Sequence, residues 1–560
     1  MLDQIPQWSE ILQTTLLLLV GILGLSVSFV FLTRRSAPFP RVGKPWLLSL
    51  LSGPWAMSFT MEKHLQTGYD RVIKKTSKPF LMRWWGLDYI FLPPKYLGDL
   101  NRSLRRTDAH GLSFFESLNE AFSLDASVGD LYSSNLMIDV VKFGLNPRLA
   151  KIAPLLESEA TYAFTKEIGT PEDWTPFPAA QLLNNIVLRT TSRILIGPEL
   201  CRDDNFLKSF QDFGISIFNN GLLCSILPPL PGFLRRPLRR LFTPLFHKRS
   251  LDRAIQLVQP TVQARFDKDK FHPSTSPSLS SDPELELEDA IEWTLSLTKS
   301  IHPAEQNPER ITLTLLLNLW ASNAGPAETL TNMIFQILYD PVYLPALRSE
   351  AEESFRVNGS YTDNALSLHD MPLLDSFIRE INRLYPTDSV TCMRTVTNNN
   401  NGFELHDGLR LPVGSRMAVP SRAIQTDVDN YADPLRFDGF RFARMRKSKR
   451  PQRGSSGGFD KKDIKLLLEE AKKYSATALS ETYLPFGFGR HACPGRWYAI
   501  LMIKIIFTKL ILEYDLKWDL NEGVIQKVRP ASLSLNGMFL PNQKQQVWLR
   551  RRNSSMKSSN

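Results

Sequence analysis

Residues 484–499 have the sequence LPFGFGRHACPGRWYA, and the interpretation of the whole chain starts from them. The cysteine in this stretch, Cys493, lies among glycines, which let a backbone pass close to a flat ligand. An apolar helix is expected from about Trp497. A thiolate beside a helix N-terminus is stabilised by unpaired N–H groups and by the helix dipole. The stretch therefore predicts a cysteine thiolate that binds a metal.

The other cysteines favour haem over zinc as the partner of this thiolate. Cys201, Cys224 and Cys392 lie far apart, with no CxxC spacing and no disulfide framework. One thiolate is too few protein ligands for zinc. It is enough for haem iron, because the porphyrin supplies four nitrogens and needs only an axial ligand.

Phe486–Gly495 resembles, residue by residue, the cysteine-ligand loop of the cytochrome P-450 family. The resemblance implies that haem b (iron protoporphyrin IX) is the cofactor and that Cys493 is the axial iron ligand. It also implies that Phe486, Gly489 and Gly495 contact the cofactor.

Two arginines are expected to bind the haem propionates. Arg490 matches the propionate-binding position of the family loop. Arg394, just after an expected helix and turn, is a second candidate, because a guanidinium binds a carboxylate through two parallel hydrogen bonds. For Arg394 the alternative is an arginine on a surface strand.

Two further segments resemble elements of the same family. Glu380 and Arg383 stand at i and i+3 on a predicted helix, so they share a face and can pair. Phe437–Phe442 (FDGFRF) resembles the later segment whose arginine, here Arg441, completes a Glu-Arg-Arg network. We expect these three residues to have a structural role.

The expected fold is mainly α with a small β region, which is the cytochrome P-450 fold. Apolar spacing predicts helices at 149–168, 180–196, 311–339 and 373–384, and strand character at 84–92, 391–396 and 408–419. The amino-acid sequence of several stretches resembles that of membrane-bound fungal members of the family, which modify terpenoids and alkaloids in secondary metabolism.

The N-terminus predicts one transmembrane helix. Ile11–Leu32 carries no charged residue and is about as long as a helix that crosses a bilayer core of roughly 30 Å. Arg34 and Arg35 follow it, which places the body of the protein in the cytosol, as expected for the endoplasmic reticulum. A cleaved signal peptide is the alternative. We therefore expect a membrane anchor at 1–35 and a haem-thiolate catalytic domain at 36–560.

A second contact with the bilayer is one of two interpretations of Gly214–Phe246. Apolar residues there adjoin the Arg235–Arg240 cluster, as in a surface that dips into lipid headgroups. The alternative is a buried helix pair with a solvated basic face. The chain of 560 residues carries a net charge of +10, which suits anionic lipid or an acidic partner. We expect no nucleic-acid partner.

The expected central helix departs from the family pattern. Most members carry an acid and then an alcohol here, which deliver protons to dioxygen. In this chain Ala324 and Gly325 occupy those positions. Glu328 and Thr329 form an acid–alcohol doublet one helical turn later, and Pro326 should kink or widen the helix between them.

Three possibilities stay open for proton delivery. The kink brings Glu328 and Thr329 to the oxygen, or water carries protons from the freed carbonyl region and from Ser322 or Asn323. In the third, Glu328 and Thr329 pair with neighbours away from the iron.

The main functional hypothesis is a haem-dependent monooxygenase that oxidises a hydrophobic small molecule, such as a terpenoid, in a biosynthetic pathway. The altered pair also allows a haem-thiolate isomerase or dehydratase, and a haem sensor or carrier is a third class. By analogy with family positions, the resemblance implies that Leu317, Ala321, Ser322, Ser389 and Val390 line the pocket.

The chain has no flavin or nicotinamide fingerprint, so we expect an NADPH-dependent reductase as electron donor. Arg496 and the Arg444–Arg450 cluster are candidates to meet an acidic surface on that donor.

Overall fold

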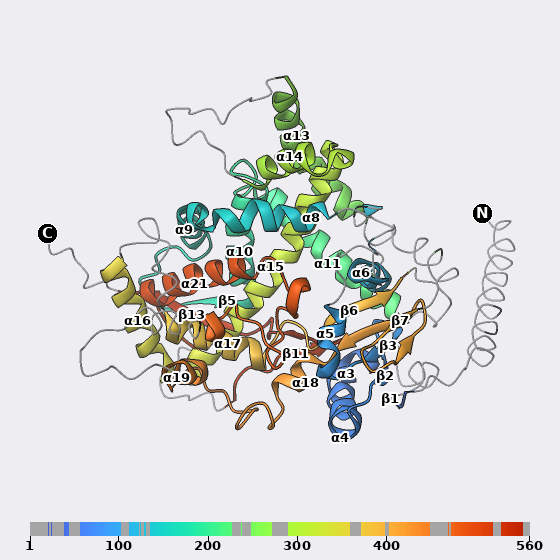
Figure 1. Ribbon diagram of the computed structural model, residues 1–560. Coiled ribbons are helices and arrows are strands. Elements are labelled where there is room, and N and C mark those ends of the chain that lie inside the picture. Colours follow the sequence, from blue (N-terminus) through green and yellow to red (C-terminus); the bar gives the residue numbers. More distant parts are fainter. Residues whose placement is uncertain are drawn as a thin grey trace, which may run out of the picture.

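The computed structural model describes residues 21, 24, 39–43, 56–101, 111–122, 124, 128–129, 131, 135–226, 237, 248–271, 289–358, 371–397, 402–448, 469, 472–518 and 528–552. These residues form a mostly helical body. The largest sheet lies on the side of α3 and α4, and most of the long helices lie away from it (Figure 1). The predicted fold class, mainly α with a small β region, is confirmed.

The four long helices predicted from apolar spacing are present. They are α9 (Leu149–Glu167), α10 (Ala179–Leu195), α15 (Pro308–Tyr339) and α17 (Pro372–Leu384). The other helices are α3 (Ala56–Gly68), α4 (Lys74–Thr76), α5 (Leu97–Leu100), α6 (Phe114–Phe122), α8 (Leu136–Asp139), α11 (Asp204–Ile226), α13 (Arg249–Phe271), α14 (Ala290–Ser300), α16 (Tyr343–Asn358), α18 (Ser421–Gln425), α19 (Arg441–Ser448) and α21 (Arg496–Glu513).

The main sheet has six strands in the order β1-β2-β3-β9-β6-β4. They are β1 (Arg41–Val42), β2 (Phe80–Trp84), β3 (Leu87–Phe91), β9 (Arg416–Val419), β6 (Thr391–Val396) and β4 (Leu112–Ser113). The small sheets contain β5 (Thr175–Pro178), β7 (Phe403–Glu404), β8 (Arg410–Leu411), β10 (Tyr514–Lys517), β11 (Leu533–Leu535), β12 (Met538–Leu540) and β13 (Gln546–Arg551). All three predicted strand regions are confirmed, and 391–396 coincides with β6.

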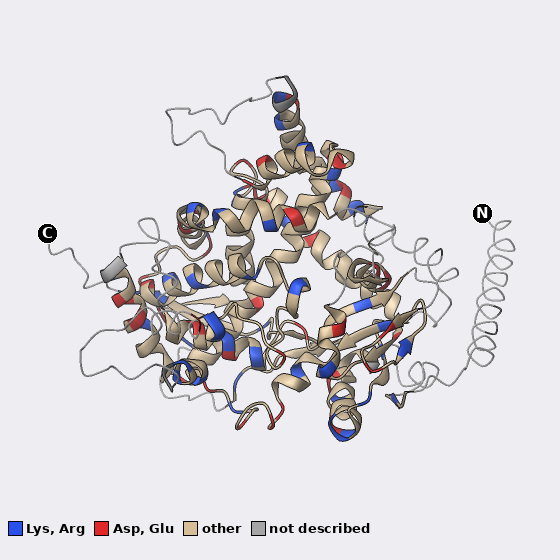
Figure 2. Ribbon diagram, in the orientation of Figure 1, with Lys and Arg blue, Asp and Glu red and all other residues tan. Residues whose placement is uncertain are grey.

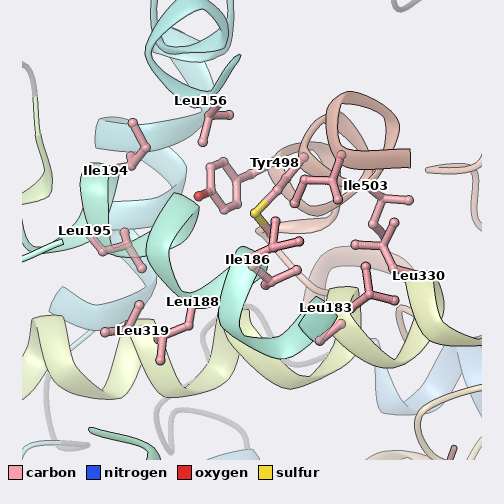
Figure 3. Close-up of a cluster of buried hydrophobic side chains, with 14 of the residues drawn as sticks. Leu156, Leu183, Ile186, Leu188, Ile194, Leu195, Leu319, Leu330, Tyr498 and Ile503 are labelled. Carbon is pink, nitrogen blue, oxygen red and sulfur yellow. The ribbon is translucent and has the colours of Figure 1, made fainter. Parts of the chain in front are cut away.

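The hydrophobic core is built around α15. Side chains from α9, α10, α15 and α21 interdigitate there, and Tyr498 and Ile503 place the start of α21 against α10 and α15 (Figure 3). Helix α21 directly follows Cys493 in the chain. Its packing therefore fixes the end of the cysteine loop relative to the central helix.

A buried ion-pair network ties α17 to the segment before α19. Arg383 is 0% exposed, and its Nε and Nη2 each donate to the Glu380 carboxylate at 2.8 Å. Its Nη1 donates to the carbonyl oxygens of Gln425 at 2.8 Å and Pro434 at 2.7 Å. Arg441 Nε donates to Glu380 Oε1 at 3.2 Å. This geometry confirms the expected structural role of the three charged residues.

The predicted transmembrane segment and the segment with a possible second bilayer contact fall largely outside the described residues. The predicted transmembrane segment Ile11–Leu32 is not described apart from two isolated positions, and the Arg235–Arg240 cluster lies beyond the end of α11. Within the described part of the chain, no helix combines the length and apolar composition that a bilayer crossing needs.

Candidate functional site

The cysteine loop owes its shape to glycines in the left-handed backbone region. Gly487 has φ +74° and Gly489 has φ +64°, and residues other than glycine rarely adopt these backbone angles. A Cβ atom on Gly489 would also lie 2.2 Å from Asn101 Nδ2. The side-chain oxygen of the same Asn101 accepts the Arg490 backbone N–H at 2.7 Å. The loop closes where the Cys493 N–H donates to the Phe486 carbonyl oxygen at 2.8 Å. The backbone conformation and the close contact with Asn101 therefore both favour glycine at position 489.

Cys493 is exposed and lies just before α21, as predicted. Gly495 precedes the first residue of that helix, and its carbonyl oxygen accepts the Ala499 N–H at 2.9 Å. Asn146 Nδ2 donates to the Pro494 carbonyl oxygen at 3.0 Å, which joins the loop to the start of α9. Among the described residues, no three His, Cys, Asp or Glu side chains converge on a common metal position. The thiol therefore suits a cofactor that brings its own ligands.

Arg394 is a buried cation without a described counter-ion. It is 5% exposed, its Nη1 donates to the Met393 carbonyl oxygen at 2.5 Å, and its guanidinium lies 5.7 Å from the centroid of the Phe114 ring. Burial lowers the pKa of Arg394. Its strand adjoins the cysteine loop, since the Phe488 backbone hydrogen-bonds the Cys392 sulfur. A bound carboxylate would supply the missing charge partner, which fits a haem propionate.

Two other predicted loop residues take contrasting positions. The Arg490 side chain is exposed, and no described carboxylate pairs with it. Phe486 is half-buried against the main hydrophobic core. The loop therefore combines an apolar anchor with a free cation, a combination that suits a cofactor with an apolar ring and anionic edges.

Small residues form an accessible face on α15. The helix is buried over most of its length, but Ala321 and Ala324 are exposed and Ser322 and Gly325 are half-buried. These positions are three or four residues apart, so they share one side of the helix. The four residues that form this face have no bulky side chain.

The acid–alcohol doublet on α15 is split by its surroundings. The helix continues through Pro326 without an end, and Glu328 lies half-buried one turn after Ala324. Thr329, in contrast, is 5% exposed, and its hydroxyl donates to Asn382 Oδ1 on α17 at 3.0 Å. The Thr329 hydroxyl is therefore engaged in helix packing, whereas Glu328 shares the accessible side of the helix.

Burial keeps the Glu328 carboxyl group protonated near neutral pH. Burial raises its pKa to about 8, with Asp388 adding to the rise and the Thr387 hydroxyl opposing it. Its Oε2 atom is buried and has no hydrogen-bond partner in the described part of the chain. Sequence analysis missed Thr387 and Asp388. No spacing in the sequence indicates them, because they approach α15 only in the folded chain.

The remaining pocket candidates divide into two groups. Ser389 and Val390 are 1% and 2% exposed and lie beside Thr387 at the end of α17. Leu317 is 1% exposed and belongs to the main hydrophobic core. The structure therefore favours Ala321 and Ser322 over Leu317 as residues that contact a ligand.

The candidates to meet an electron donor are mostly engaged within the protein. Arg496 donates to the carbonyl oxygens of Cys493 at 2.9 Å and Thr477 at 3.2 Å, and it stacks 3.5 Å from the Trp497 ring centroid. Arg444 pairs with Asp438. Helix α19 contains basic residues and no aspartate or glutamate, and Figure 2 marks its basic positions. The end of the Arg444–Arg450 cluster lies outside the described residues.

Comparison with known proteins gives a consistent result. The family model described as Cytochrome P450 matches residues 144–546. The chain is 36% identical over 517 residues to "Cytochrome P450 monooxygenase sirB" of Leptosphaeria maculans, which covers 91% of this chain and 90% of the relative. It is 26% identical over 550 residues to "Cytochrome P450 monooxygenase paxP" of Penicillium paxilli, with 96% of each covered. It is 25% identical over 479 residues to an "Ent-kaurene oxidase" of Gibberella intermedia, with 84% and 81% covered. The chain therefore belongs to the cytochrome P450 family of haem-dependent monooxygenases.

Proposed function

We propose that this monooxygenase oxidises a hydrophobic small molecule, a terpenoid or a related fungal secondary metabolite, with Cys493 as the axial ligand of its haem. The observation that carries the proposal is the exposed thiol of Cys493, held in a glycine-shaped loop at the start of α21. The relatives support the substrate class, since one of them is named for the oxidation of ent-kaurene.

The residues of the chain would divide the work as follows. The Cys493 thiolate would hold the cofactor and donate electron density to it. Arg394 and Arg490 would bind its propionates, because neither guanidinium has a described carboxylate partner. The small residues on α15 would leave space for the substrate. When bound, the haem supplies the redox chemistry that activates dioxygen.

Electrons would come from an NADPH-dependent reductase in the membrane of the endoplasmic reticulum, where the segment Ile11–Leu32 would anchor the chain with its catalytic domain in the cytosol. The basic α19 supports an electrostatic contact with an acidic donor surface. Raising the ionic strength should then slow reduction, because salt screens exposed charges. A reduction rate that does not depend on salt would count against this contact.

An isomerase or dehydratase remains the second candidate, because Ala324 and Gly325 stand where an acid and an alcohol are expected. Accurate-mass comparison of metabolites from the source organism and from a strain lacking the chain separates the two. Gain of oxygen or loss of two hydrogens across the missing step supports oxidation. A product that is isomeric with the accumulated compound, or differs from it only by water, overturns the monooxygenase proposal.

A further inference from the structure

The position that lacks a side-chain alcohol on α15 has a hydroxyl beside it from another part of the chain. A Cβ atom built on Gly325 would lie 3.6 Å from Thr387 Oγ1, an ordinary van der Waals contact. A side-chain hydroxyl projecting from position 325 would enter the same space. Thr387 thus presents its hydroxyl beside the helix position where an alcohol is missing.

The nearest acid on this side of the helix also interacts with Thr387. Glu328 follows Gly325 by three residues, so the two positions share a helix face. The Thr387 hydroxyl interacts with the Glu328 carboxyl group, and Glu328 Oε2 is buried without a partner in the described structure. An unpartnered buried oxygen is costly to a fold. The acid and the hydroxyl therefore form one unit contributed by two elements.

Backbone contacts hold the Thr387 segment firmly in place. The Phe539 N–H donates to the Thr387 carbonyl oxygen at 3.1 Å, and the Ser389 N–H donates to the Gly537 carbonyl oxygen at 2.7 Å. Asp388 Oδ1 accepts the Val390 N–H at 3.0 Å. The bonds to Phe539 and Gly537 connect the segment to the β11–β12 hairpin and fix the backbone that carries the Thr387 hydroxyl.

We propose that Thr387 supplies the catalytic hydroxyl that α15 lacks at Gly325, and that Glu328 acts through it as the positioning and proton-supplying acid. This inference rests on the proposed monooxygenase function. Thr329, which donates to Asn382, has no part in the transfer. Catalytic hydrogen bonds often shorten only when ligands are bound, so the role does not require a short contact between Thr387 and Glu328 in this structure.

The proton balance of one turnover defines what this unit does. Dioxygen takes two electrons from the reductase and two protons, and one oxygen atom enters a substrate C–H bond while the other leaves as water. Both of these protons would come from the chain. Thr387 would give its hydroxyl proton to the departing oxygen and regain one from Glu328, and Glu328 would be reprotonated from solvent. This relay would run twice in each turnover, which accounts for both protons.

The test compares Thr387→Val with Thr387→Ser, using the compound that accumulates in a strain lacking the chain as substrate. General acid–base groups contribute about 10²–10⁴-fold in rate. We expect Thr387→Val to lower product formed per NADPH at least about tenfold and to release peroxide instead. Thr387→Ser should restore most of the coupling, because it keeps the hydroxyl. Equal coupling in all three proteins would overturn the proposal.

Thr329→Val is the matched comparison, because it removes a hydroxyl of the same type from the same region. Its ratio of product to NADPH should stay close to that of the parent chain. Uncoupling by Thr329→Val together with full coupling in Thr387→Val would assign the transfer to Thr329 and refute the proposal.

An infrared measurement gives a readout that does not require turnover. The band of a protonated carboxyl group that disappears in Glu328→Gln should shift in Thr387→Val, since the hydrogen bond to the carboxyl group is lost. An unshifted band would show that the two side chains do not interact.

If the parent chain lacks the thiolate-type carbon-monoxide spectrum, the proposed function fails. If that spectrum is normal and the Thr387 variants behave alike, only this inference fails.

Discussion

Replacement of Glu328 by glutamine should make the folded protein more stable, relative to the parent chain, at pH 8 than at pH 6. Burial of this carboxyl group on α15 raises its pKa to about 8 from its ordinary value of 4.5. Above pH 4.5 the unfolded chain loses this proton while the folded chain keeps it. Stability therefore falls with rising pH until the folded group also ionises near pH 8. Glutamine does not ionise and removes this loss.

The shift sets the size of the effect. One pKa unit corresponds to about 1.4 kcal/mol, so the upper limit of the gain is about 2 kcal/mol at pH 6 and about 4 kcal/mol at pH 8. The amide needs a partner for its nitrogen in place of the unpartnered Oε2, which costs about 1–3 kcal/mol at every pH. The difference between the two pH values, about 2 kcal/mol, is therefore the diagnostic quantity.

Urea unfolding of the holoenzyme at pH 6 and pH 8 measures this difference, at a fixed haem concentration because bound ligand stabilises the folded state. Asp388, whose pKa is raised to about 7 by burial and further raised by Glu62, titrates in both proteins and largely cancels. Glu353→Gln is the control. Glu353 is exposed and pairs with Arg356 at 2.6 Å, so this variant should show no gain that grows with pH. A Glu328→Gln gain that is equal at both pH values would refute the reasoning.

Three further substitutions test the site and its support. Gly489→Ala should lose at least about 1–2 kcal/mol of stability from its left-handed backbone, and more from the contact with Asn101; an unchanged urea midpoint would contradict this. Arg394→Ala should weaken haem binding about tenfold or more, the value of one charge-assisted hydrogen bond, as measured by haem transfer to apomyoglobin; equal transfer rates would exclude propionate binding. Arg383→Ala should cost about 3–5 kcal/mol because it leaves Glu380 buried without its main partner, so little folded protein should be recovered; a normal yield and melting temperature would contradict a structural role.

Local pattern was enough to predict the scaffold. Apolar periodicity located α9, α10, α15 and α17 to within a few residues, because each helix buries a continuous face against the same core. Strand β6 was predicted at its observed bounds, since its residues are rich in β-branched side chains and the turn-forming Asn398–Gly402 follows. The cysteine loop was predictable because one short stretch contains all of its special residues.

The details of proton supply could not be predicted because they depend on contacts between distant segments. The sequence shows Glu328 and Thr329 as neighbours, yet packing turns the Thr329 hydroxyl to Asn382. It also brings Thr387 to Gly325, a contact that no spacing rule indicates. Arg394 was named as a candidate, but its lack of a described counter-ion emerges only when the strand is placed in the fold.

The carbon-monoxide difference spectrum of the reduced protein tests the central claim most directly. The parent chain should show the red-shifted band that a thiolate ligand gives to the reduced carbon-monoxide complex. Cys493→Ala should lose that band and its activity, while Cys201→Ala, which removes a buried thiol from another part of the fold, should keep both. A red-shifted band that persists in Cys493→Ala would contradict the assignment of Cys493 as the axial ligand.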